Sequence, residues 1–233
     1  MNILTLGLLF ASVIAGAIVV EVFKPKKGRN IQILLTFSGA YLLAVSVLHL
    51  LPELFRDDDT DKYIGLYILG GFLIQIVLEY FSQGIEHGHF QKRKIIPFSV
   101  LISLGLHALL EGIPLGGHLH DHALHAHNSL LTGIVMHKMP VAIVLMTFFL
   151  QSNMQKSKAY FYLLLFALMS PLGVFAGDLA SLDKFHDEIM AMVIGIFLHI
   201  STTILFESSG GHKFSSQKIL AIIVGACIAI LSL

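Results

Sequence analysis

Eight apolar runs, each of roughly 20 residues, follow one another along the chain and are separated by short polar connections. A run of roughly 20 residues crosses a bilayer as an α-helix, and in lipid only helices and closed barrels satisfy the backbone hydrogen bonds. The runs are too long for barrel strands, and only 13% of the residues are charged. We therefore predict an all-α, polytopic membrane protein with a single transmembrane domain over residues 1–233. Its eight transmembrane helices are expected at about 3–23, 31–55, 63–82, 96–117, 128–150, 159–182, 188–207 and 215–232.

Positive charges in the connections predict which ends of these helices face the cytoplasm. The connections after the first, third, fifth and seventh runs hold most of the basic residues: Lys24, Lys26, Lys27, Arg29, Lys92, Arg93, Lys94, Lys156, Lys158, Lys213 and Lys218. The opposite connections hold only Arg56, Lys62 and Lys184. Because cytoplasmic loops are enriched in Lys and Arg, both termini are predicted to be extracytoplasmic. The basic residues mark topology, and nothing in their pattern indicates nucleic-acid binding.

Two histidines and a glutamate lie in the middle of apolar runs. His107 and Glu111 are four residues apart in the fourth run and share one face of a helix, and His137 lies at a similar depth in the fifth run. Each such group costs roughly a few kcal/mol in hydrocarbon unless it meets a partner, water or an ion. Imidazole and carboxylate are metal ligands, and the single cysteine, Cys227, excludes a cysteine-rich zinc module. The pattern predicts an intramembrane metal site.

The segments around these residues, SLGLHALLEGIPLGG and GIVMHKMPVAIV, resemble the fourth and fifth helices of the ZIP (Zrt/Irt-like protein) family of divalent-metal transporters. The family motifs read roughly His-Ser/Asn-x-x-Glu-Gly in the fourth helix, His-Glu-x-Pro-x-Glu in the fifth and Glu-Pro-x-Gly in the sixth. The matching positions are His107, Glu111, Gly112, His137, Pro140, Pro171 and Gly173. The resemblance implies an eight-helix bundle in which helices 1–3 and 6–8 form an inverted repeat around helices 4 and 5. It also implies a homodimer in a plasma or bacterial inner membrane, with a metal path from outside to the cytosol.

Four positions depart from these motifs, and each would supply a ligand to the second metal ion that many ZIP proteins hold. They are Ala108 in the fourth helix, Lys138 and Val141 in the fifth, and Ser170 in the sixth. The first site keeps His107, Glu111 and His137. The comparison with the family therefore implies one metal ion rather than two.

Lys138 is the most informative of the four replacements, because burial and a nearby metal ion both disfavour its charged form. In one interpretation its ammonium group takes the place of the missing cation and holds Glu111 when the site is empty. In a second, it competes with the metal for Glu111 and tunes turnover. In a third, the side chain reaches an interface or pairs elsewhere and has no role at the site.

The connection between the fourth and fifth runs is rich in histidine. It contains His118, His120, His122, His125 and His127. Histidine clusters bind transition metals weakly and exchange them quickly, so this segment is predicted to capture metal for the deeper site. The alternative is a polar loop without that role.

Further polar residues lie within or near the ends of other runs. His49 and Glu53 are four residues apart near the outer end of the second run, as an entry station for metal or as a hydrogen-bonded pair at a helix end. His199 in the seventh run is expected to line the path or to support a ligand, with direct ligation as an alternative. Gln75 lies one turn from Glu79 in the third run and is a possible hydrogen-bond partner for it.

Glycines and prolines interrupt the central runs. Gly173 and Gly177 are expected to pack one helix closely against another, as small residues do in membrane proteins. Pro114 and Pro140 stand beside the candidate ligands and are expected to line a cavity, because each frees a backbone carbonyl.

The function favoured by these residues is transport of a divalent transition metal, with Zn2+ as the transported substrate and other divalent metals as alternatives. The three ligands would bind the ion firmly enough to select it, while their incomplete shell lets it leave. No organic cofactor and no enzymatic activity are expected. Two other interpretations stay open: an intramembrane zinc enzyme with water as the fourth ligand, and a family member that senses or stores metal without transporting it.

Overall fold

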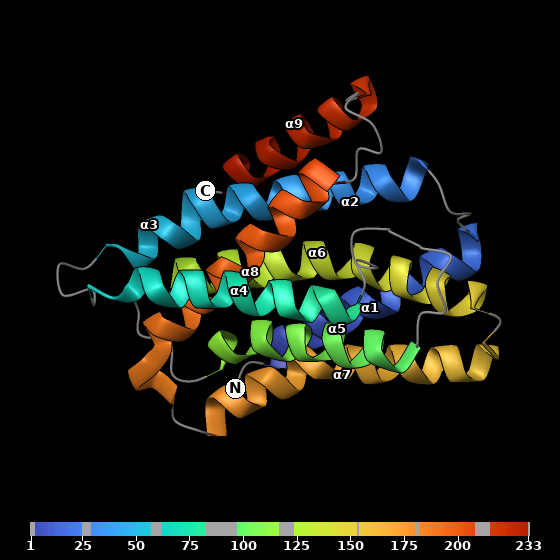
Figure 1. Cartoon of the computed structure of the whole chain (residues 1–233), viewed down its shortest axis with the longest axis horizontal. Coiled ribbons are helices and arrows are strands. Elements are labelled where there is room, and N and C mark those ends of the chain that lie inside the picture. The colour runs from blue at the N-terminus through green and yellow to red at the C-terminus, as the bar shows by residue number, and fades with distance from the viewer. Residues whose placement is uncertain are drawn as a thin grey trace.

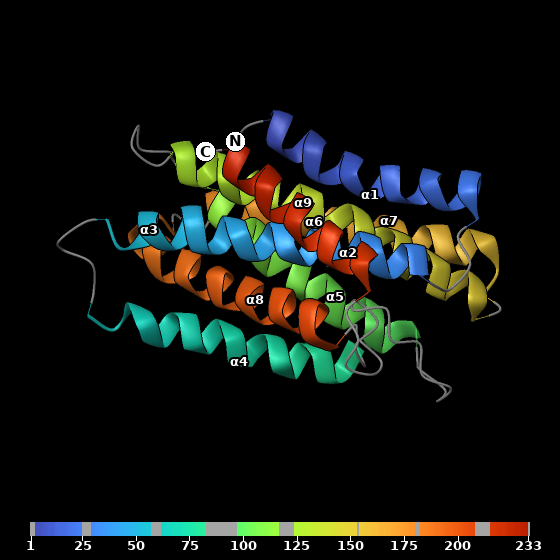
Figure 2. The same ribbon diagram turned by 90° about the horizontal axis from the view of Figure 1, so that it is seen from above.

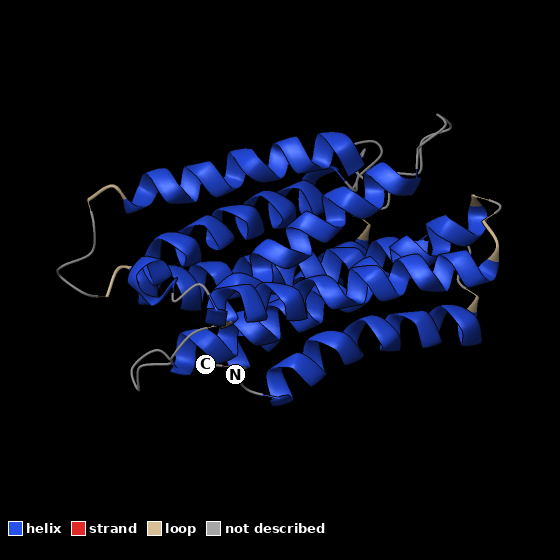
Figure 3. Ribbon diagram, turned by 90° about the horizontal axis from the view of Figure 1, so that it is seen from below, coloured by secondary structure: helices blue, strands red, loops and turns tan. Residues whose placement is uncertain are grey.

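A computed structural model describes residues 3–24, 29–56, 62–82, 97–116, 124–152, 154–179, 182–207 and 215–232. Every regular element in these ranges is a helix, as Figure 3 shows, and no strand occurs in them. The helices run side by side along the long axis of the molecule (Figure 1). Their bounds are α1 Ile3–Phe23, α2 Arg29–Val45, α3 Leu51–Leu54, α4 Ile64–Ser82, α5 Pro97–Gly112, α6 Leu124–Gln151, α7 Lys156–Leu179, α8 His186–Glu207 and α9 Ser216–Leu231.

Short turns of other helix types extend three of these helices. A π-helical turn over Ser46–Leu50 joins α2 to α3, and a 3-10 turn over Ile113–Leu115 continues α5. A second 3-10 turn, Leu182–Phe185, leads into α8. The π turn has a local cause, because Pro52 has no N–H to donate to the carbonyl four residues earlier.

Within the described residues, seven stretches of helix are long and apolar enough to cross a membrane, and the second of them, Asn30–Leu54, includes α2 and α3. Large apolar side chains such as Ile18, Leu66 and Phe161 are exposed on the outside of the bundle, where lipid would cover them. The predicted all-helical, polytopic membrane architecture is therefore confirmed. The last apolar helix, α9, has 16 residues and is about 24 Å long, shorter than the roughly 30 Å of a hydrocarbon core. The eighth span thus stays a prediction.

The contacts divide the helices into two groups. One group holds α2, α4, α8 and α9, and the other holds α1, α5, α6 and α7. The most extensive helix contacts join α4 to α8, α2 to α9, α1 to α6 and α5 to α7. Contacts of α2 with α8 and of α1 with α7 complete the two groups, and α2–α6 and α4–α5 contacts link them. Figure 2 shows α4 and α8 side by side at one edge of the bundle and α1 at the opposite edge.

Helix α6 is the most buried of the membrane-length helices and runs through the core. Its apolar side chains, among them Val144, Leu145 and Phe149, are buried against the surrounding helices. A residue on α6, such as His137, is therefore enclosed by protein on most sides.

Glycines set how closely α5 approaches α7. A Cβ atom on Gly173 would overlap the carbonyl oxygen of Leu109, and one on Gly112 would overlap that of Ser170. Gly116 and Gly177 meet in the same way one turn further along the two helices. The two Gly-x-x-x-Gly pairs thus bring the backbones together, as expected for Gly173 and Gly177, and fix the position of the helix that carries His107 and Glu111.

Candidate metal centre

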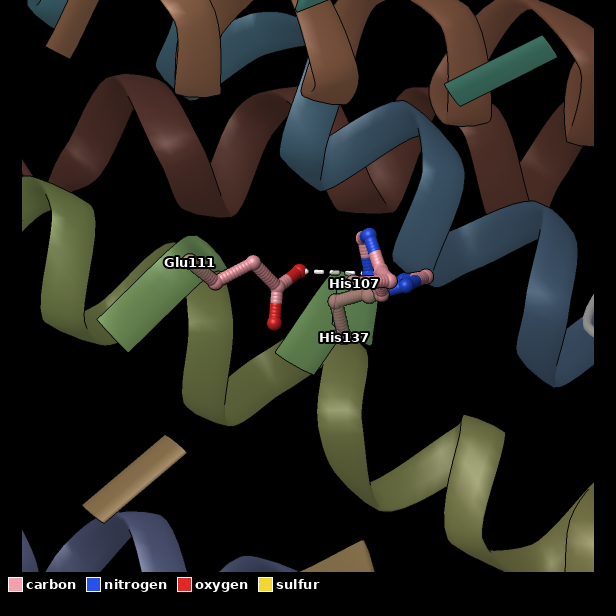
Figure 4. Close-up of side chains that lie close together, drawn as sticks. All are labelled: His107, Glu111 and His137. Atoms are coloured by element: carbon pink, nitrogen blue, oxygen red, sulfur yellow. Dashed lines mark ion pairs between the residues drawn. The ribbon is translucent and has the colours of Figure 1, made fainter. Parts of the chain in front are cut away.

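Side chains from two helices bring the three predicted ligands together in the bundle. His107 and Glu111 project from one face of α5, and His137 projects from α6 toward them (Figure 4). One ligand atom from each residue lies within 4.8 Å of the others. Zinc bonds to such atoms at about 2.0–2.2 Å, so the donors need only a small inward movement to share one ion. Among the described residues, this is the one group of three or more His, Cys, Asp or Glu side chains that could hold a metal.

The three ligands are enclosed by protein. Their relative exposures are 2% for His107, 1% for Glu111 and 2% for His137. The Nε2 atom of His107 lies 2.8 Å from Oε1 of Glu111, and the two imidazole rings meet edge to face with their centroids 6.1 Å apart. Oε1 of Glu111 and Nε2 of His107 therefore lie close enough for one cation to bind both.

Residues on two other helices contact the imidazole nitrogens that face away from Glu111. Gln75 on α4 places its Oε1 atom 3.1 Å from Nδ1 of His107. Ser38 on α2 places its hydroxyl 3.2 Å from Nδ1 of His137. The amide oxygen can only accept, so Nδ1 of His107 donates in this contact, and Nε2, which faces Glu111, is the ring nitrogen left to bind a metal.

The contacts of Gln75 and Ser38 with the candidate ligands are not predicted by the sequence pattern. The sequence indicates Glu79 as a possible partner of Gln75 on the same helix, and the structure adds a contact between Gln75 and His107. Both side chains are fully buried within apolar helices. A buried amide or hydroxyl must find a partner, and that requirement is the signal that could have identified them.

Three of the four positions that depart from the two-metal pattern meet beside Glu111. Lys138, with 2% relative exposure, donates a hydrogen bond from its ammonium group to the hydroxyl of Ser170. The Ser170 hydroxyl in turn donates to the carbonyl oxygen of Ala108 at 2.7 Å. Lys138 Nζ lies 3.9 Å from Oε2 of Glu111 and 5.0 Å from the centre of the Phe166 ring.

The fourth position, Val141, is buried on α6 and offers no donor atom. A lysine, a serine and two apolar side chains thus occupy the positions at which the ZIP motifs carry ligands for a second metal. Lys138 is buried next to Glu111, as its two functional interpretations require.

His49 and Glu53, which follow α2 in the π turn and in α3, do not pair with each other. His49, in the π turn, contacts the carbonyl oxygen of Ala229 through Nε2 and the hydroxyl of Ser129 through Nδ1, both at 3.1 Å. Glu53 instead lies 3.3 Å from the guanidinium of Arg56. This is the geometry of hydrogen-bonded residues at a helix end, and an entry station at His49 and Glu53 stays a prediction.

His199 lies on α8 and contacts a different carboxylate. Its Nε2 atom is 2.5 Å from Oε2 of Glu79 on α4, and its ring meets Phe72 edge to face. The three-residue ligand group does not include it, so its place on the metal path stays a prediction.

The histidine-rich connection is described only at its end. His118, His120 and His122 lie outside the described residues, as does the side chain of His125. His127, in the first turn of α6, is buried with 7% relative exposure. Nearby, Pro114 lines a small pocket with Gly177 and His186.

Comparisons with known proteins place these observations in a family. The model of the ZIP zinc transporter family matches residues 84–232, which is more than half of the chain. Zinc transporter ZIP9-B of Xenopus laevis is 24% identical over an alignment of 171 residues that covers 67% of this chain and 56% of that protein. Zinc transporter ZIP9 of Micropogonias undulatus is 22% identical over an alignment of 193 residues that covers 71% of this chain and 62% of that relative. The chain thus spans less than two thirds of the length of these relatives.

Proposed function

The chain belongs to the ZIP zinc transporter family, and we propose that it transports a divalent transition metal, with zinc as the leading substrate. The observation that carries this proposal is the group of His107, Glu111 and His137, buried together between two membrane-length helices. Two imidazoles and a carboxylate suit zinc and also several neighbouring metals. Three protein ligands leave part of the coordination shell open, which allows the ion to be released again.

We further propose that the path holds one metal ion at this depth. The contacts of Lys138 with Ser170 and Glu111 support this, because they fill the place of a second ion with a fixed positive charge. A metal ion next to that ammonium would face direct charge repulsion. One face of the Glu111 carboxylate then serves the transported ion and the other faces Lys138.

The proposed direction is from outside to the cytosol by alternating access, with both termini extracytoplasmic. All three ligands lie on α5 and α6, in one helix group, whereas Gln75 and Ser38 reach them from the other group. A relative movement of the two groups would therefore carry the ligands past these hydrogen-bond partners. Such rocking of one bundle against another is a common means of exposing a midplane site to each side in turn.

An inverted repeat of membrane helices 1–3 and 6–8 fits the contact pattern. In the labels of Figure 1, the first three are α1, α2 with α3, and α4, and the last three are α7, α8 and α9. Under that repeat α1 corresponds to α7, α2 to α8, α4 to α9 and α5 to α6. The exchange turns the α1–α6 contact into α5–α7 and the α2–α9 contact into α4–α8, and these four are the most extensive contacts in the bundle. A homodimer in a plasma or bacterial inner membrane, with one transmembrane domain per chain, completes the proposal.

Metal flux into sealed proteoliposomes tests the proposed function. Zinc or cadmium uptake is expected for the wild type and is expected to be lost in His107→Ala and in Glu111→Ala. Thr132→Ala is a matched control on α6, because the Thr132 hydroxyl bonds only to carbonyls of its own helix. Tight binding without uptake in the wild type would contradict transport and would favour a metal sensor; turnover of a lipid or peptide would favour an enzyme.

A further inference from the structure

The contacts that support the candidate ligands are of two kinds, according to the helix group from which they come. Lys138 and Ser170 lie on α6 and α7, in the same group as the ligands, and they contact each other, Glu111 and the α5 backbone. Ser38 and Gln75 lie on α2 and α4, in the other group. A relative movement of the two groups would leave contacts of the first kind intact and would break those of the second kind.

Both contacts of the second kind reach the Nδ1 atom of a ligand imidazole. The hydroxyl of Ser38 lies 3.2 Å from Nδ1 of His137. The Oε1 atom of Gln75 lies 3.1 Å from Nδ1 of His107. A partner on one ring nitrogen fixes the orientation and tautomer of an imidazole, and this raises the affinity of the other nitrogen for a metal. The two imidazoles are thus held as ligands by residues of the opposite group.

Glycine contacts show where the helices are in close backbone contact. A Cβ atom would overlap a carbonyl oxygen of the neighbouring helix at Gly16 between α1 and α6, at Gly71 between α4 and α8, and at Gly225 between α9 and α2. All three contacts lie within a group. Gly133, on α6 at the boundary between the groups, instead faces side chains of α2 and α8, and the nearest of their atoms lies 3.6 Å from an added Cβ. Close backbone contact therefore holds each group together, whereas at Gly133 the groups meet through side chains.

We propose that Ser38 and Gln75 are positioning residues whose withdrawal releases the metal. When the groups are docked as in this structure, these two residues hold His137 and His107, and the ion binds tightly. When the groups move, the ligands lose both supports at once and the affinity for the ion falls, while the contacts within the ligands' own group persist. The release step rests on the proposed transport function, but the support of metal affinity by the two residues does not.

Zinc flux measured over a range of zinc concentrations tests this proposal, because it separates the apparent KM from the maximal rate. In proteoliposomes of the full chain, Ser38→Ala is expected to raise the KM for zinc by roughly tenfold. The maximal rate is expected to stay the same or to rise, because a bond that release must break is already missing. Ser38→Thr keeps the hydroxyl and is expected to restore the KM. Thr36→Val is the matched control on α2, because the Thr36 hydroxyl donates to the carbonyl of Gln32 in its own helix.

A cross-link between the groups tests the dependence on helix arrangement. A Cβ atom on Gly133 would lie 3.7 Å from Cγ1 of Val45 on α2, which is close to the geometry of a disulfide. Val45→Cys and Gly133→Cys are therefore combined with Cys227→Ser, and mass spectrometry verifies the cross-link. By equilibrium dialysis, the oxidised protein is expected to bind zinc at least as tightly as the wild type, and it is expected to lose flux. Adding Ser38→Ala to it is expected to weaken zinc binding by roughly tenfold.

Several results would overturn the proposal. An unchanged KM in Ser38→Ala would mean that the hydroxyl does not support the ligand. A maximal rate that falls as the KM rises would mean that the contact is needed throughout transport and that its loss is not the release step. Loss of zinc binding, or undiminished flux, in the cross-linked protein would show that the docked arrangement is not the one that holds the ion.

Failure of the proposed function would look different from failure of this inference. In that case zinc flux is absent from the wild type, while Ser38→Ala still weakens zinc binding measured by equilibrium dialysis and Ser38→Thr still restores it.

Discussion

The ammonium nitrogen of Lys138 lies 3.9 Å from Oε2 of Glu111, while the other carboxylate oxygen of Glu111 lies 2.8 Å from Nε2 of His107. One carboxylate therefore lies between a buried ammonium group and an imidazole that is a candidate metal ligand. Breaking a buried charge pair by removing one partner leaves an uncompensated charge. Lys138 and Glu111 are for this reason expected to act as a unit, and we expect metal binding to depend on both.

Lys138→Met tests which interpretation of this lysine holds. Methionine keeps much of the length and loses the charge, so Glu111 no longer has a cation to hold its second oxygen. We expect the apparent affinity for zinc to fall by roughly tenfold, as when other supporting residues of metal sites are removed. Zinc binding and flux in the same preparation measure it. A rise in affinity would instead support competition between Lys138 and the metal, and no change would contradict both interpretations.

Acids placed at Lys138 and Ser170, where the ZIP motifs carry them, should change the number of ions bound. Lys138 and Ser170 are hydrogen-bonded to each other beside Glu111, so carboxylates at these two positions would face the same space. Lys138→Glu combined with Ser170→Glu is expected to bind one more zinc ion per chain than the wild type. Equilibrium dialysis measures the count, and Lys138→Met is the control for loss of the lysine alone. An unchanged count in the double variant would mean that the second site is lost for reasons beyond these two residues.

The helical membrane architecture and the three candidate ligands that meet in the bundle could be identified from the sequence, because each depends on a local pattern. Long apolar runs permit only a few structures in lipid, and a histidine or carboxylate within such a run is conspicuous. The resemblance of the segments around His107 and His137 to the ZIP family is likewise confirmed by the family match over residues 84–232. These signals require no knowledge of how the helices are arranged.

The support of the ligands could not be predicted, because it depends on which helices are neighbours. Gln75 contacts His107, 32 residues away in sequence, and Ser38 contacts His137, 99 residues away. The sequence alone shows Gln75 and Glu79 as possible partners on one helix, and it does not show that packing of α4 against α5 and α8 brings each of them to a different histidine. Polar partners across helices are set by the helix packing, which periodicity alone does not specify.

Gln75→Leu should weaken metal binding without removing a ligand. The amide oxygen of Gln75 holds Nδ1 of His107, and without it the ring is free to rotate or change tautomer. We expect a loss of roughly 10- to 100-fold in zinc affinity, measured on the purified protein. Gln75→Glu retains an oxygen acceptor at the same place, as in the carboxylate–histidine–zinc arrangement, and is expected to keep most of the affinity. Equal losses in the two variants would mean that Gln75 acts by packing alone.

Gly173→Ala tests whether the α5–α7 crossing holds the site together. The added methyl group would overlap the carbonyl oxygen of Leu109, two residues from His107 and from Glu111. Overpacking of this kind costs about 1–3 kcal/mol, and any separation of the helices moves both ligands relative to His137. Lower thermal stability and reduced zinc flux are therefore expected together. Gly7→Ala is the matched control, because nothing lies within 4 Å of its added methyl, and both properties should stay near the wild-type level. If the two variants behaved alike, the α5–α7 contact would not determine the geometry of the metal site.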